Sequence, residues 1–282
     1  MNGFINLIKP EGMSSAYAVG GVKIKLKIPC GHMGTLDPLA SGVLPVGVGK
    51  ASRLFDYLLN KTKVYEAVFR FGELTNTLDI TGEVSATTEI IPTKEEIIAV
   101  LGSFIGEIDQ VPPNYSAKCI NGKRGYQLAR KGVEFTLAPK KVTVLKYEFL
   151  EQISKTDFKF RITCKGGTYI RSLARDLGYK LNSLAIMVSL NRTESGVFNY
   201  SNGVSVEEFV NSENPQKYLI PADTVVDFAK LVLTNEQATK LLNGLYENYG
   251  FTDGIYRVYN QTEFWGVGKV QNGILKMSAY VR

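Results

Sequence analysis

Residues 31–54 contain five glycines and two prolines, so this stretch can form tight turns and allow another backbone or a ligand to come close. One carboxylate, Asp37, lies near the centre of the stretch and directly precedes Pro38. A residue before proline is disfavoured in the helical region, so we expect Asp37 on extended loop backbone. The apolar run at 43–46 predicts a short buried strand, and a helix is expected over 50–59. The stretch therefore predicts a single acid on a rigid loop at the edge of a core.

Asp37 has two simpler interpretations. An aspartate before proline in a glycine-rich segment is most often a turn residue. The ending Gly-Val-Gly-Lys also suggests a phosphate-binding P-loop. That motif requires glycine at position 44 and serine or threonine at position 51, where this chain has Leu44 and Ala51. We therefore exclude a P-loop and keep the turn residue and the reactive acid as alternatives.

The composition predicts a soluble, cytoplasmic protein with a substantial core. Hydrophobic residues make up 44% of the 282 residues, and no stretch approaches the ~20 apolar residues of a membrane helix. The first residues lack the features of a signal peptide. The net charge of +6 fits a polyanionic partner. Three widely separated cysteines and one histidine form neither a disulfide framework nor a zinc pattern.

Hydrophobic periodicity predicts both strands and helices along the chain. Strands are expected over 4–8, 63–72 and 156–164. A helix is expected over 93–104, where Thr93 and Glu96 have the spacing of a capping box, and another begins at about 168. Ser14 or Ser15 can cap a further helix, although residues 22–28 alternate apolar side chains with lysine and would also suit a strand.

The run GHMGTLDPLASGVLPVGVGKASRL at 31–54 closely resembles the signature of the bacterial TruB family, the tRNA pseudouridine-55 synthases. The aspartate of its G-T-L-D-P segment is the catalytic nucleophile in that family, which implies this role for Asp37. The resemblance implies an α+β pseudouridine synthase fold, with a mixed, largely antiparallel sheet flanked by helices. It also implies a catalytic domain over 1–229 and a small PUA-like β-barrel module over 230–282, with Trp265 at the barrel rim.

Further motifs that resemble those of the family imply which residues surround the target base. The tyrosine of K-x-Y-x-A, Tyr65 here, would stack on the base and is a candidate to take its C5 proton. The motif G-T-Y-I-R implies that Tyr169 lies beside the base and that Arg171 pairs with the nucleophile. A segment similar to T-D-T-x-D-x-x-G implies a supporting role for Asp79. On periodicity alone, Tyr65 would be an ordinary strand aromatic and Arg171 a solvent-facing arginine.

Two more residues are expected to contact the substrate. The ending similar to L-x-R-T-x-S-G-x-F implies that Leu190 touches the target nucleotide, although an apolar leucine there would equally suit the core. His32, near Asp37 in the sequence, could stack against neighbouring nucleotides and fill the gap left by a flipped base. A hydrogen bond that stabilises a turn is the simpler role for this histidine.

Lysines and arginines interleaved with tyrosines at about 110–140 resemble the mobile RNA-gripping insertion of the family. Such a composition suits phosphate contacts and base stacking, although a basic surface loop would have it too. The residues expected to bind RNA are Lys9, Lys118, Lys123, Arg124 and Arg130.

The resemblance implies an enzyme that isomerises uridine-55 in the T-loop of tRNA to pseudouridine after flipping it out of its stack. The reaction breaks the C1′–N1 bond and forms a C1′–C5 bond without a change of oxidation state. We therefore expect no cofactor: no nicotinamide, metal or ATP. Asp37 could attack C1′, attack C6 or accompany a glycal route, and the sequence leaves these three open. Arg171 beside it would favour the ionised carboxylate.

Two rival functions are also compatible with parts of the sequence. A non-catalytic tRNA-binding or chaperone protein would need the basic insertion but not Asp37, and a chaperone role could also accompany catalysis. A hydrolytic glycosidase would need a second carboxylate beside Asp37, and Asp79 is the only candidate for it among the motif residues. We expect the synthase, acting on tRNA as a monomer without a membrane or a protein partner.

Overall fold

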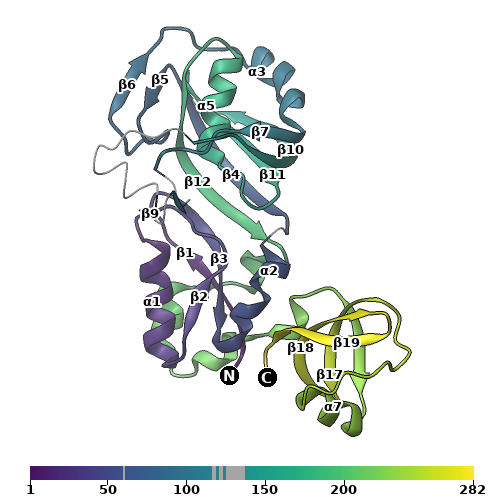
Figure 1. Ribbon diagram of the computed structural model, residues 1–282. Coiled ribbons are helices and arrows are strands. Elements are labelled where there is room, and N and C mark those ends of the chain that lie inside the picture. Colours follow the sequence, from purple (N-terminus) through teal and green to yellow (C-terminus); the bar gives the residue numbers. More distant parts are fainter. Residues whose placement is uncertain (60, 116–118, 121–122, 125–136) are drawn as a thin grey trace. The chain divides into compact units, whose positions relative to one another are not determined.

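The computed structural model describes residues 1–59, 61–115, 119–120, 123–124 and 137–282 (Figure 1). The chain divides into two compact units. Unit 1 consists of Met1–Pro38, Gly42–Lys61 and Gly196–Arg282, and unit 2 of Leu39–Ser41 and Thr62–Ser195. Unit 1 therefore combines the first and last parts of the chain, and unit 2 is built from its middle.

The sheet of unit 1 is built on two antiparallel strands, β1 (Gly3–Lys9) and β3 (Ser41–Val48). Three short strands extend it: β2 (Cys30–His32) beside β3, and β14 (Val204–Ser205) and β15 (Ile220–Pro221) beside β1. Nearly every residue of β1 and β3 is buried, which confirms the strands predicted from their apolar runs. The helix predicted over 50–59 is a 3₁₀ helix, Gly49–Leu54, followed by the short α2 (Phe55–Leu58).

Helix α1 (Ser15–Leu26) lies beside β1 and β2 in Figure 1. The hydroxyl of Ser14 caps this helix by accepting a hydrogen bond from the Tyr17 amide at 3.1 Å. Lys27 ends it in the left-handed conformation, with φ of 55°. The strand alternative for residues 22–28 is therefore wrong, because the N-terminal cap and the burial of one helix face stabilise the helix instead.

The main sheet of unit 2 has the strand order β12-β4-β11-β10-β7, and each neighbouring pair is antiparallel. These strands are β4 (Lys63–Phe71), β7 (Gly106–Gln110), β10 (Lys140–Gln152), β11 (Asp157–Cys164) and β12 (Ala185–Ser195). Along β4, buried residues alternate with half-exposed ones, as the sequence predicts. On the buried face the rings of Phe69 and Phe160 lie 5.0 Å apart between centroids.

Helix α5 (Ile170–Lys180) packs on β12 and β4, and α3 (Lys94–Leu101) packs on β10. Both helices were predicted, and the capping box of α3 is confirmed by reciprocal hydrogen bonds between Thr93 and Glu96. Smaller elements complete the chain: β5 (Glu73–Thr75), β6 (Val84–Thr87), β8 (Cys119–Ile120), β9 (Lys123–Arg124), β13 (Phe198–Asn199) and α6 (Val206–Asn211). Short 3₁₀ helices occupy Gly102–Phe104, Tyr200–Asn202, Pro215–Tyr218 and Ala222–Thr224. In the part of the chain that is described, no helix has the length and apolar composition needed to cross a membrane.

The last part of unit 1 contains a second sheet, with the strand order β16-β17-β18-β19. Its elements are β16 (Ala229–Leu233), α7 (Asn235–Leu242), β17 (Gly254–Asn260), β18 (Glu263–Gln271) and β19 (Ile274–Tyr280). Trp265 is 1% exposed in its core rather than at a rim. Among the described residues the sheet stays open between β16 and β19, so the predicted closed barrel is not observed. Val267 and Val281 join a core cluster with Phe4 of β1.

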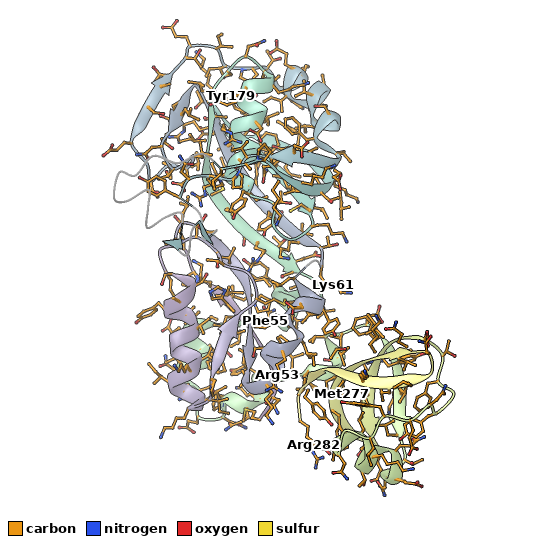
Figure 2. The ribbon with its side chains drawn as sticks, in the orientation of Figure 1. Arg53, Phe55, Lys61, Tyr179, Met277 and Arg282 are labelled. Carbon is orange, nitrogen blue, oxygen red and sulfur yellow. The ribbon has the colours of Figure 1, made fainter. Side chains whose placement is uncertain are left out.

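One glycine of the sequence stretch 31–54 has a clear packing role. Phe55, labelled in Figure 2, begins α2, and its ring lies directly against Gly47 of β3. A Cβ atom at position 47 would lie 2.7 Å from the Cε1 atom of that ring. The absence of a side chain at this position therefore allows the ring to pack onto the strand.

Candidate active site

Asp37 lies in the loop between β2 and β3, and hydrogen bonds hold the residues on both sides of it. The hydroxyl of Ser15 donates to the carbonyl of Leu36 at 2.8 Å and accepts from its amide at 2.9 Å. The carbonyl of Pro38 accepts from the amide of Gly12 at 2.8 Å. Leu36 is buried and Asp37 is half-buried. The loop conformation predicted for Asp37 is confirmed, and its neighbours fix the backbone that carries the acid.

Lys9 supports the same loop from the end of β1. Its side chain is 0% exposed, and Nζ donates to the carbonyls of Pro10 at 2.8 Å, Met13 at 2.7 Å and Pro38 at 3.4 Å. A buried ammonium group requires such partners. The predicted contact of Lys9 with RNA is therefore wrong, because its charge points at backbone carbonyls inside the protein. Lys9 ties the turn after β1 to the loop of Asp37.

Asp79 organises a tight turn between β5 and β6. Its Oδ1 accepts hydrogen bonds from Thr77 Oγ1 at 2.8 Å, from the Thr81 amide at 3.0 Å and from Thr81 Oγ1 at 2.6 Å. Its backbone carbonyl accepts from Thr75 Oγ1 at 2.7 Å. A Cβ atom at Gly82 would overlap Thr77 Oγ1, which the hydrogen bond to Asp79 holds in place, so glycine lets the turn close without displacing that bond. The turn thus buries a carboxylate and supplies it with hydrogen bonds.

Arg171 reaches this turn from the first turn of α5. Its Nη1 lies 3.4 Å from Asp79 Oδ2 and donates to the Thr77 carbonyl at 2.9 Å, while Nη2 donates to the Tyr115 carbonyl at 2.9 Å. Arg171 is 6% exposed, so the solvent-facing interpretation is wrong. These partners hold the guanidinium in one orientation. The pairing of Arg171 with Asp37 stays a prediction, because the two residues belong to different units.

Tyr65 and Leu190 lie on one face of the unit 2 sheet. The register of β4 and β12 pairs Tyr65 with Arg192 and Ala67 with Leu190. Residues directly opposite each other on antiparallel strands place their side chains on the same face. All four side chains are buried. This face therefore combines an aromatic ring, a leucine and a guanidinium near the start of β4, and the burial of Leu190 also fits a core role.

Positive charge gathers at the same end of the face. Lys63 lies two residues before Tyr65, so its side chain emerges on the same side of β4. Burial, and to a lesser degree repulsion from Arg192, lowers the pKa of the Lys63 ammonium to about 8. Two cationic side chains thus share a poorly solvated region beside the ring of Tyr65, which favours an anionic group placed there.

Tyr169 is held by Gln110, for which the sequence predicted no role of its own. Gln110, the last residue of β7, is 1% exposed. Its Nε2 donates to the Tyr169 carbonyl at 3.1 Å, and its Oε1 accepts from the Tyr169 amide at 2.8 Å. The partners are backbone groups 59 residues away, so no local pattern reveals the contact. Its only sequence signal is its place at the start of the predicted insertion.

Comparison with protein families decides how these residues are to be understood. Residues 22–170 match the model of the TruB family pseudouridylate synthases (N terminal domain). The chain belongs to the TruB family. The tRNA pseudouridine synthase B of Clostridium kluyveri is 40% identical over 98% of both chains, and that of Aquifex aeolicus is 38% identical over 98% of both. The resemblance seen in the sequence is confirmed, and this TruB family member is a pseudouridine synthase.

Solved structures extend the TruB family likeness to the fold. The chain in a Cbf5-Nop10-Gar1 complex is 28% identical with a TM-score of 0.70, and the match covers 95% of this chain and 78% of that one. The matching chain in a structure of an H/ACA RNP bound to a substrate RNA containing 2′-deoxyuridine is 27% identical, with a TM-score of 0.69. That match also covers 95% of this chain and 78% of the other. These matches confirm the predicted α+β pseudouridine synthase fold.

The structure describes some, but not all, of the other residues that were predicted to contact RNA. Lys118 and Arg130 lie outside the described residues. Lys123 and Arg124 form β9, whose backbone pairs with β8. His32 is the last residue of β2 and is half-buried. The RNA contacts of these five residues stay predictions.

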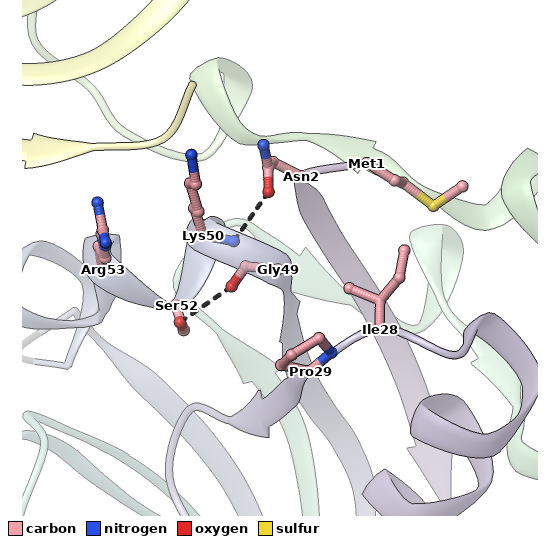
Figure 3. Close-up of a pocket in the computed structure, with 8 residues that line it drawn as sticks. All are labelled: Met1, Asn2, Ile28, Pro29, Gly49, Lys50, Ser52 and Arg53. Atoms are coloured by element: carbon pink, nitrogen blue, oxygen red, sulfur yellow. Dashed lines mark hydrogen bonds between the residues drawn. The ribbon is translucent and has the colours of Figure 1, made fainter.

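Unit 1 contains a pocket of about 410 Å³, and Figure 3 draws the residues that line it. It is lined by Met1, Asn2, Ile28, Pro29, Gly49, Lys50, Ser52 and Arg53. The Lys50 amide donates to Asn2 Oδ1 at 2.8 Å, and Ser52 Oγ donates to the Gly49 carbonyl at 3.1 Å. None of the predicted site residues of this TruB family member lines it. In the described residues, no three His, Cys, Asp or Glu side chains form a group that could hold a metal ion.

Proposed function

We propose that this TruB family enzyme converts the uridine at position 55, in the T-loop of tRNA, to pseudouridine. The observation that carries the proposal is the likeness, over 98% of both chains, to a relative named tRNA pseudouridine synthase B. The structural neighbour bound to a substrate RNA that contains 2′-deoxyuridine supports an RNA substrate. The pre-formed loop of Asp37 supports catalysis by a single fixed carboxylate.

In the proposed reaction, Asp37 acts as the nucleophile on the flipped uridine. The C1′–N1 bond breaks, the base turns within the site, and a C1′–C5 bond forms. The proton on C5 is lost and N1 gains one, so the product is an isomer of the substrate. Attack at C1′, attack at C6 and a glycal route all satisfy this balance, and each requires an ionised carboxylate close to the nucleotide.

The remaining site residues would hold the base and the charge. Tyr65 and Tyr169 offer rings on which a detached base can stack. Tyr65 is also our candidate to accept the C5 proton. Arg171, which Asp79 and two carbonyls orient, would pair with Asp37 and keep it ionised. Leu190 would contact the target nucleotide.

Recognition of the tRNA would involve parts of the chain beyond these residues. We propose that His32 fills the space left by the flipped uridine. The insertion at about 110–140, with Lys118, Lys123, Arg124 and Arg130, would contact phosphates. Residues 230–282 would act as a PUA-like RNA-binding module beside a catalytic domain over 1–229. We further propose that the enzyme works as a monomer in the cytoplasm without a protein partner.

A T-arm stem-loop RNA with tritium at C5 of its uridines tests this function. We expect the wild-type protein to release the tritium of one uridine per RNA, and to leave the mass of the same RNA without the label unchanged. The matched control RNA carries cytidine at position 55 and should release none. Release from another uridine would contradict the position, loss of a base would indicate a glycosidase, and binding without release would favour a tRNA-binding chaperone.

Replacement of Lys9 by methionine tests the support of the Asp37 loop. Methionine preserves most of the volume but cannot donate to the carbonyls of Pro10, Met13 and Pro38. We expect kcat to fall by about 10- to 100-fold, because a displacement of a reacting group by ~1 Å has an effect of this size. KM for the RNA should change little, since Lys9 is buried. If Lys9→Met instead lowers the affinity for RNA and leaves kcat unchanged, that result would support a direct contact between Lys9 and RNA.

A further inference from the structure

The segment from Gln110 to Tyr115 is joined to the start of α5 by several hydrogen bonds. Ser172 Oγ donates to the Val111 carbonyl at 2.8 Å, and Arg175 Nη2 donates to the same carbonyl at 3.1 Å. Arg171 Nη2 donates to the Tyr115 carbonyl at 2.9 Å. In each of these contacts a side chain of α5 reaches out to the backbone of the segment.

Gln110 makes a contact in the opposite direction. Its side chain, which belongs to the segment, bonds the backbone at the start of α5. Its carboxamide bonds both the amide and the carbonyl of Tyr169, the N-cap residue of α5. The same Tyr169 carbonyl accepts the first helical hydrogen bond, from the Leu173 amide at 3.1 Å. Because a primary amide presents one donor and one acceptor side by side, it can bond both groups of one residue as a paired strand would.

The position of Gln110 makes this contact rigid. Its own backbone is paired with Lys140 of β10, so the side chain projects from the sheet rather than from a free loop. The side chain is 1% exposed, and water does not compete for the two bonds. The orientation at which α5 begins is therefore set by an amide anchored in the sheet of unit 2.

We propose that Gln110 is a positioning residue for catalysis. By fixing the backbone of Tyr169, it sets the direction of the tyrosine ring. It also sets the backbone position of Arg171, two residues later, from which the guanidinium side chain extends. The inference rests on the proposed roles of Tyr169 and Arg171. It assigns Gln110 no contact with substrate, so its loss should act on the rate of the bound complex and not on RNA affinity.

The first test is Gln110→Met, which keeps the length of the side chain and removes both hydrogen bonds. The readout is total pseudouridine formed in bulk unmodified tRNA, which does not depend on the uridine chosen. We expect kcat to fall by about 10- to 100-fold, as for a small misplacement of a reacting group, with KM within about three-fold of the wild type. The control is Ser183→Ala, at a buried residue beyond the opposite end of α5, which removes the 2.5 Å hydrogen bond from Ser183 Oγ to the Ile90 carbonyl. It should lower Tm but keep kcat within about two-fold, as expected for a site outside the catalytic residues.

The second test is Gln110→Glu, measured on protein that is folded. It distinguishes an effect of Gln110 on the position of Tyr169 from an effect on the stability of the fold. A protonated carboxyl has one donor and one acceptor, like the amide, whereas a carboxylate only accepts and would oppose the Tyr169 carbonyl. Burial raises the pKa of such a carboxyl, so kcat relative to the wild type should recover as pH falls from about 8 to 5. The charged neighbours are Asp109 of β7, Lys140 of β10, and Arg171 and Arg175 of α5. These neighbours are present in the variant and in the wild type. The ratio of the two kcat values therefore reports the protonation of the new carboxyl.

The outcomes separate this inference from the proposed site. A kcat of Gln110→Met within two-fold of the wild type, or a flat pH ratio for Gln110→Glu, would overturn the positioning role. A loss of kcat equal to that of Ser183→Ala at matched folded fractions would also overturn it. An Arg171→Lys variant with wild-type kcat would refute the site assignment itself, and with it the inference. Loss of kcat in Arg171→Lys but not in the Gln110 variants would refute the inference alone.

Discussion

Replacement of Asp37 by asparagine is expected to abolish pseudouridine formation while the protein stays folded. Asparagine has the shape of aspartate but cannot supply a nucleophilic carboxylate, so kcat should fall by roughly 10⁴-fold or more, as when other enzymes lose a nucleophile. The fold should persist, because the loop is held through Ser15, Gly12 and Lys9. Tritium release from C5-labelled RNA measures the activity, and circular dichroism with a thermal melt measures the fold.

The matched control for this prediction is Asp56→Asn, which makes the same chemical change at an exposed aspartate of α2 in unit 1. It should keep the activity and Tm of the wild type. Binding of the RNA by Asp37→Asn should remain close to that of the wild type, since one carboxylate adds little to a largely phosphate-driven affinity. Residual turnover above about 1% of wild type would exclude Asp37 as an obligatory nucleophile.

Replacement of Asp79 by alanine should have the largest effect on stability. It removes the ion-pair partner of a buried guanidinium and leaves the hydroxyls of Thr77 and Thr81 without their acceptor. Breaking a buried ion pair from one side costs about 3–5 kcal/mol, so the free energy of unfolding should fall by this amount. Activity should fall as well, because Arg171 loses a group that orients it. Urea unfolding measures the first effect and single-turnover kinetics the second.

An exposed ion pair in the same unit provides the comparison. Glu107 lies 2.6 Å from Lys141, and the two side chains are 59% and 69% exposed. Glu107→Ala should therefore change the free energy of unfolding by less than about 1 kcal/mol. Asp79→Asn should be intermediate, because an amide oxygen still accepts from Thr81. Equal effects of the Asp79 and Glu107 substitutions would show that burial does not govern the strength of the pair.

Much of the fold was predictable because the signals were local. The alternation in β4 and the capping box at Thr93 depend on residues within a few positions of each other, and both are confirmed. The motif around Asp37 predicted its loop for the same reason. The strand alternative for 22–28 failed because alternation in a short window cannot be told from a helix face, and the cap at Ser14 decides between them.

The rest depended on contacts between distant parts of the chain. Lys9 looked like a surface cation, yet its ammonium is buried among carbonyls that include one 29 residues away. Gln110 was recognised only as the first residue of the predicted insertion, because its partners are backbone atoms of Tyr169, 59 residues away. Trp265 was placed at a barrel rim, whereas the apolar side chains of an open sheet enclose it. Such assignments follow from tertiary packing, which periodicity does not report.

The hydrogen bonds around Asp37 join protein atoms to protein atoms, and this has a consequence for how the enzyme uses its substrate. Ser15, Gly12 and Lys9 order the loop during folding, so the entropy of ordering it is already lost before RNA arrives. Binding energy from the RNA is then available for extracting the uridine from its stack rather than for assembling the acid. Natural variation in the stem sequence should accordingly alter KM, while kcat stays a property of the protein.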